Sequence, residues 1–91
     1  MSDITRDYSF GGWVRHIRLS NQITLRAAAS TAGMDAGNLS KIERSELTPP
    51  MKKESLAVIV KAIQASPDQE VLLKSLAFQH HLALLRKRFF T

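Results

Sequence analysis

This sequence of 91 residues contains no cysteine, and that absence excludes several kinds of chemistry together. Disulfide bonds, thiolate metal sites and cysteine nucleophiles all require the missing residue. The chain is therefore expected to be held together by its core or by a partner, which suits a cytoplasmic location. Residues 1–10 lack the apolar stretch of a signal peptide. The apolar runs elsewhere are too short and too often interrupted by charge to span a bilayer.

The sequence also lacks the alternation of apolar and polar residues that marks a half-buried strand, and it has no internal repeat. Hydrophobic residues make up 44% of the chain, enough for the modest core of one domain. Because the apolar residues recur at helical spacing, we expect an all-α fold with about five helices. The formal net charge of +5 favours a polyanionic partner, although charge alone is a weak indicator of nucleic-acid binding.

Three helices are expected in the first half of the chain. Residues 1–9 have no periodicity and are expected to form a flexible arm, whereas 10–21 carry apolar residues on one helical face, with Arg15, His16, Arg18 and Asn21 on the other. Thr24 is a favourable N-cap for the alanine-rich segment that follows. Gly33 can end that helix in the left-handed conformation, and Asp35 can cap the next one, at 35–44.

Two more helices are expected after the turn made by the sequence SELTPP. Residues 52–65 place Leu56, Ile59, Val60 and Ile63 three or four positions apart, which indicates an amphipathic helix. The sequence Ser66-Pro67-Asp68-Gln69 then combines a cap, a proline at the first position, an acid and a capping-box glutamine. The helix that it opens is expected to reach about Arg88.

Residues 24–49, read TLRAAASTAGMDAGNLSKIERSELTP, combine the features of a helix-turn-helix unit. Small residues in the first helix allow the second helix to cross closely, a glycine suits the turn, and apolar residues anchor the second helix. At these points the sequence resembles the Xre/Cro-type, lambda repressor-like helix-turn-helix family. The residues that carry this likeness are Ala28, Ala29, Gly33, Met34, Leu39 and Ile42.

The resemblance extends over roughly residues 10–65. Phe10-Gly11, followed by Val14-Arg15 and Arg18, is similar to the first-helix pattern of the family, and Ile42-Glu43 with Pro49 is similar to its ending. Two departures stand out. Ser45 occupies the place of a usual glycine, where the turn could be strained, and Ala27-Ala28 replace an acid and a leucine, which would loosen the core.

The resemblance implies that residues 10–65 form a DNA-binding domain with helix 35–44 in the major groove. It also implies that Arg18 pairs with Glu43 and so ties the first helix to the recognition helix. The alternative is that both are solvated surface charges of little energetic value. Likewise, the polar face of helix 35–44 could be an ordinary solvated surface. The expected base contacts are Ala36, Gly37, Asn38 and Lys41, and the expected backbone contacts are Thr24, Leu25, Arg26, Ser40 and Arg44.

The C-terminal helix, within residues 66–91, is more apolar than a small domain needs. We expect its exposed stripe to form a homodimer interface, which would place two recognition helices about one DNA turn apart on a palindromic operator. The alternatives are that the helix packs on its own core or binds another protein. The basic sequence Arg86-Lys87-Arg88 suits a helix C-terminus, where positive charge is favoured. These charges could be solvated or could contact a DNA phosphate. The stripe residues are Val71, Phe78, Leu82, Leu85 and Phe89.

The sequence therefore predicts a homodimeric DNA-binding transcriptional regulator, most simply a repressor. The second hypothesis is an antitoxin-like or other interaction module whose last helix binds a partner protein. No catalytic triad, paired carboxylates, phosphate loop or metal-ligand spacing is visible, so an enzyme, a cofactor, a small-molecule substrate and a membrane partner are not expected. His80 and His81 are adjacent, and helical metal pairs usually sit four residues apart, so no metal is expected.

Overall fold

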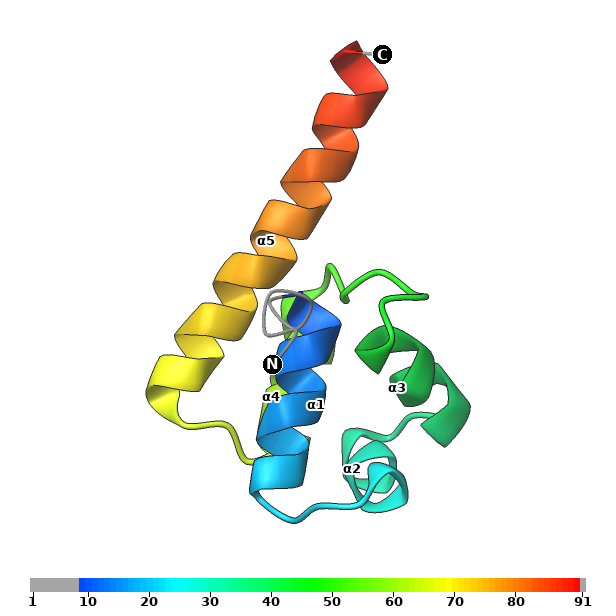
Figure 1. Cartoon of the computed structure of the whole chain (residues 1–91), viewed down its shortest axis with the longest axis vertical. Helices are drawn as coiled ribbons and strands as arrows, with labels where there is room; N and C mark the ends of the chain where they lie inside the picture. Colours follow the sequence, from blue (N-terminus) through cyan, green and yellow to red (C-terminus); the bar gives the residue numbers. More distant parts are fainter. Residues whose placement is uncertain (1–8, 91) are drawn as a thin grey trace, which may run out of the picture.

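The computed structural model describes residues 9–90 of the chain. This part contains five α-helices and no strand (Figure 1). The expected all-α class with about five helices is confirmed. Within this range no helix is both long and apolar enough to cross a membrane. The helices are α1 (Phe10–Ser20), α2 (Leu25–Ala32), α3 (Ala36–Glu43), α4 (Lys53–Ala62) and α5 (Pro67–Phe90).

Side-chain caps begin four of the five helices. The Thr24 and Asp35 side chains accept hydrogen bonds from backbone N–H groups at the starts of α2 and α3, at 3.1 and 3.2 Å. Ser66 and Gln69 form the reciprocal bonds of a capping box before α5. Ser9, expected in the flexible arm, instead accepts a 3.0 Å bond from Gly12 N and caps α1. The other residues of that arm, 1–8, lie outside the described residues.

The core lies among α1, α2, α3 and α4, with α5 packed along one side (Figure 1). The most buried large side chains come from α1, α3, α5 and α4 with its C-cap, and none comes from α2. The small Ala28 and Ala29 on α2 are also buried, which allows close packing there. The largest fully buried residues are Val14, Ile17, Leu39, Ile59, Ile63 and Leu73.

Helix α5 packs on the domain mainly through its N-terminal half, where Leu73 and Ala77 are buried. The later turns of α5 project past the other helices (Figure 1). Leu84, Leu85 and Phe89 on those turns are all exposed. The helix is therefore longer than the domain that supports it.

Candidate nucleic-acid interface

The α2–α3 connection is a tight turn that fixes the direction of α3. Gly33 ends α2 with φ +69°, in the left-handed region, and its N–H donates to Ser30 O. The N–H of Met34 then donates to Ala29 O at 2.9 Å. Asp35 caps α3 immediately afterwards. Only three residues separate the helices, so the orientation of α3 follows from this turn chemistry.

The C-terminal end of α3 is also closed by a specific turn. Ser45 has φ +62°, so it adopts the conformation that glycine prefers, and its N–H donates to Ile42 O. Its hydroxyl donates to the hydroxyl of Ser9 at 3.3 Å. The N–H groups of Glu46 and Leu47 both donate to Lys41 O. The departure noted at Ser45 thus lies at a residue with an unfavourable backbone conformation.

Gly11 allows α1 to pack closely against the end of α3. A side chain at this position would overlap the carbonyl oxygen of Ile42 and lie within 3 Å of the carbonyl group of Glu43. Helix α1 can therefore touch the end of α3 backbone to backbone. The family pattern contains this glycine, but the sequence alone gave no physical reason for it.

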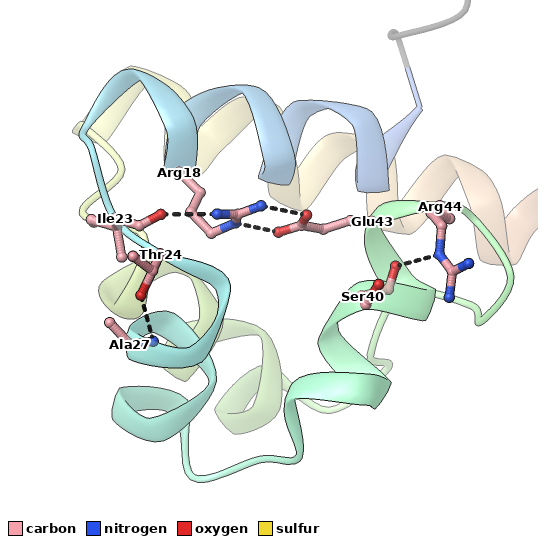
Figure 2. Close-up of polar contacts among 7 residues, drawn as sticks. All are labelled: Arg18, Ile23, Thr24, Ala27, Ser40, Glu43 and Arg44. Atoms are coloured by element: carbon pink, nitrogen blue, oxygen red, sulfur yellow. Dashed lines mark hydrogen bonds and ion pairs between the residues drawn. The ribbon is translucent and has the colours of Figure 1, made fainter.

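A buried ion pair joins α1 to α3 (Figure 2). Arg18 Nε and Nη2 donate to the two carboxylate oxygens of Glu43 at 2.7 and 2.9 Å. Arg18 Nη1 donates to Ile23 O at 2.9 Å, so the same guanidinium also fixes the chain before α2. The two side chains are 8% and 4% exposed, which is incompatible with a pair of solvated surface charges. The structure thus brings together the two residues that the resemblance paired.

Arg18 is a correction to the expected polar face of α1, and Asn21 on that face has a role that the pattern did not predict. Arg15 and His16 are exposed there, whereas Arg18 is buried. The amide of Asn21 donates to Ile63 O at 2.8 Å and to Gln64 O at 3.1 Å, which satisfies carbonyl groups at the end of α4. Helical periodicity predicts a face but cannot reveal a buried partner from another helix.

The residues expected to contact bases divide into two groups. Gly37, Asn38 and Lys41 are exposed on the outer face of α3. Ala36, expected to be exposed, is instead half-buried against the core. At Gly37, a side-chain carbon would lie 2.8 Å from the capping carboxylate of Asp35, so the glycine also makes room for the cap.

The residues expected to contact the DNA backbone lie at the start of α2 and towards the end of α3. Thr24 and Arg26 are exposed at the start of α2, whose first N–H groups have no acceptor within the helix. Leu25 and Ser40 are half-buried. Arg44 lies at the far end of α3, where Nε donates to Ser40 O at 3.4 Å and the guanidinium pairs with Glu46 (Figure 2).

Comparison with known proteins gives no match: no protein-family model, curated protein or solved structure corresponds to this chain. The class that the structure itself defines is an all-α domain. Within it, a short, polar-faced helix is fixed at both ends and along its inner side.

Proposed function

We propose that this protein is a sequence-specific, double-stranded DNA-binding transcriptional regulator with a lambda repressor-like helix-turn-helix, in which helix 35–44 enters the major groove. One observation carries the proposal. The inner side of α3 is immobilised by Leu39, Ile42 and the Arg18–Glu43 pair, while Asn38 and Lys41 remain exposed on its outer side. A recognition helix needs this combination of fixed position and available polar groups.

The exposed groups have the chemistry to read and hold DNA. An asparagine side chain can donate to and accept from adenine, and a lysine can donate to guanine O6 and N7. Arg26 and Arg44 are exposed and could neutralise phosphates, Arg44 by exchanging its pair with Glu46, and the amide groups at the start of α2 suit a phosphate oxygen. The acids Asp35 and Glu43 do not prevent the approach of DNA to this face. Asp35 caps α3, and Glu43 is neutralised by Arg18.

The regulator would act as a homodimer on a palindromic operator, and the simplest outcome of binding near a promoter is repression. Exposed apolar side chains on α5 support pairing of two copies, because monomers seldom leave large apolar patches in water. Two-fold symmetry of the protein would then require two-fold symmetry of the DNA site.

Fluorescence anisotropy of the purified protein with DNA from upstream of its own gene tests the proposal. A random duplex serves as competitor, and titrations run at low and at physiological salt. Binding that survives the competitor at physiological salt supports sequence-specific regulation. Equal, weak binding to both duplexes that disappears with salt would reject it and leave only a basic domain.

A second candidate function is an antitoxin-like or other protein-interaction module that binds its partner through α5. The observation that favours it is the exposure of Phe78 and Phe89, 66% and 76%. Sedimentation of the purified protein separates the two candidates. A monomer that retains this exposed surface and does not bind operator DNA would favour the interaction module.

A further inference from the structure

Helix α5 carries a regular apolar seam on its exposed side. Positions 71, 78, 82, 85 and 89 follow one another with the four- and three-residue steps of a heptad repeat, and Ser75 fills the one remaining seam position. All of the large side chains in the seam are exposed. This seam consists of Val71, Ser75, Phe78, Leu82, Leu85 and Phe89.

The domain of the same chain covers little of the seam. In helical projection, at 100° per residue, Leu73 and Ala77, which pack on the core, lie about 160° and about 120° from the middle of the seam. Helix α5 therefore has two apolar faces, and only one of them is used within the chain.

A groove runs beside the seam and adds to it. Phe78, Leu82 and Leu85 form one wall, Met51 and Leu56 lie across from them, and the volume is about 470 Å³. Met51 is 81% exposed. His81 also lines the groove, and its Nε2 is the one buried side-chain polar atom, among those of the described residues, without a hydrogen-bond partner. Because buried polar atoms normally have a hydrogen-bond partner, this atom indicates that the groove is not fully packed by the single chain.

The exposed area matches a protein interface. At roughly 200 Å² for each large apolar side chain, the exposed fractions along the seam and at Met51 amount to on the order of 700 Å². This is above the patches that monomers usually expose, about 300–600 Å². It approaches the area of about 800 Å² that each partner contributes to a standard interface.

The charges beside the seam determine which partner and orientation fit. Asp68 and Glu70 lie in the first turn of α5, and Arg86 and Arg88 lie near its end. In helical projection Asp68 and Arg86 share one flank of the seam, and Glu70 and Arg88 share the other. Two parallel copies would place like charges side by side at both ends. Two antiparallel copies would place Glu70, which already pairs with Lys74 of its own chain, within one turn of Arg88 on the same flank, and Asp68 within two turns of Arg86.

We propose that the occupant of this surface is α5 of a second copy, running antiparallel, so that the two seams form a two-stranded coiled coil. The heptad positions fix the register. Val71 meets Phe89 of the second copy and Phe78 meets its Leu82, while Ser75 meets Leu85. His81 then lies beside the two-fold axis. This inference deepens the dimer proposed above and does not use the DNA contacts.

Cysteine cross-linking tests the orientation, because the natural chain has no cysteine. The variants Val71→Cys and Phe89→Cys are prepared separately, mixed, equilibrated and oxidised. Antiparallel pairing predicts that the mixed dimer, recognised by its mass, dominates, with at least tenfold less self-linking of either variant. Ser30→Cys, at an exposed position of α2, is the control that measures random cross-linking. Self-linked Val71→Cys dimers as the main product would overturn the antiparallel register.

Sedimentation tests the pairing itself. Phe78→Asp is expected to raise the dimer Kd at least 100-fold with unchanged helical content, because Phe78 is exposed in the single chain. Ala83→Asp, also exposed but away from the seam, is the matched control and should change the Kd less than threefold. A wild-type protein that is monomeric at about 100 µM would overturn this inference, even if it bound DNA specifically. A dimer that cross-links as expected but ignores DNA would reject the proposed function alone.

Discussion

The guanidinium of Arg18 holds both carboxylate oxygens of Glu43 and, on its third side, the carbonyl oxygen of Ile23 (Figure 2). Helix α1, the end of α3 and the chain just before α2 therefore meet at one planar group. A lysine has the same charge but cannot make this set of bonds, because its ammonium group lacks the fixed fork geometry. The pair positions the exposed outer face of α3 from behind, without itself reaching the surface.

Breaking this pair should destabilise the fold strongly. Glu43→Leu leaves the Arg18 charge buried and unpaired, so we expect a loss of about 3–5 kcal/mol in the free energy of unfolding, measured by urea denaturation. Glu46→Ala, which breaks the exposed Arg44–Glu46 pair, is the control and should cost less than about 1 kcal/mol. Arg18→Met combined with Glu43→Leu should recover most of the loss. Equal, small losses in the two single variants would contradict the buried character of the pair.

Gly11 should not tolerate even alanine. The added carbon would meet backbone carbonyl groups of α3, which no side-chain rotation can relieve. We expect thermal unfolding to show a loss at or above the usual overpacking cost of about 1–3 kcal/mol. Ser20→Ala, at an exposed position of the same helix, should change stability by less than about 0.5 kcal/mol. A stable Gly11→Ala variant would mean that α1 and α3 are farther apart than described.

Ser45→Gly should stabilise the protein. The backbone at Ser45 has φ +62°, which glycine adopts without the steric cost of a side chain. We expect a gain of up to about 1 kcal/mol, reduced by loss of the weak bond to Ser9. Ser30→Gly, on the exposed side of regular helix α2, should instead cost about 0.5–1 kcal/mol. The same sign of change in both variants, measured by chemical denaturation, would argue against the left-handed turn.

Asn38→Ala and Lys41→Ala should each weaken binding to the operator by roughly 1–3 kcal/mol and relax the preference for particular bases. Both side chains are exposed, so the fold should remain intact. Competition anisotropy against operators with single base changes measures the effect. Lys61→Ala on α4 is a charge-matched control, expected to alter binding only slightly.

Arg26→Ala should behave differently, because a phosphate contact carries no sequence information. We expect binding to specific and random duplexes to weaken alike, and the slope of log K against log salt to become shallower by about one. If Arg26→Ala and Lys41→Ala affected the two duplexes in the same way, the division into backbone and base contacts would be wrong.

Local chemistry in the sequence predicted most of the fold. Thr24, Gly33, Asp35 and the Ser66–Gln69 box mark helix ends through bonds to residues close in the chain, and the structure contains each of them. Such signals are readable because both partners lie within a few positions. Ser9 also caps its helix through a bond to a residue close in the chain. Its role was not predicted, because the segment before it has no recognisable pattern.

Long-range features were harder to predict. The family resemblance implied that Arg18 pairs with Glu43, but the periodicity of its helix indicated a polar face and did not predict its burial. Nothing local shows that Asn21 closes the end of α4, or that Ala36 turns toward the core. At the candidate interface, exposure of Asn38 and Lys41 followed from the pattern, since polar residues opposite an apolar stripe usually face water.

In the proposed dimer, the length of α5 would link the assembly of this protein to its lifetime. Beyond Leu82 the helix has little of its own domain to pack on, and helical segments of about a dozen residues are marginal in water without tertiary packing. When dilution separates the two copies, this end of α5 would lose its helical structure and become accessible to proteases. Scarce protein would then be degraded faster than abundant protein, so the level in the cell would tend toward either a stable pool or none.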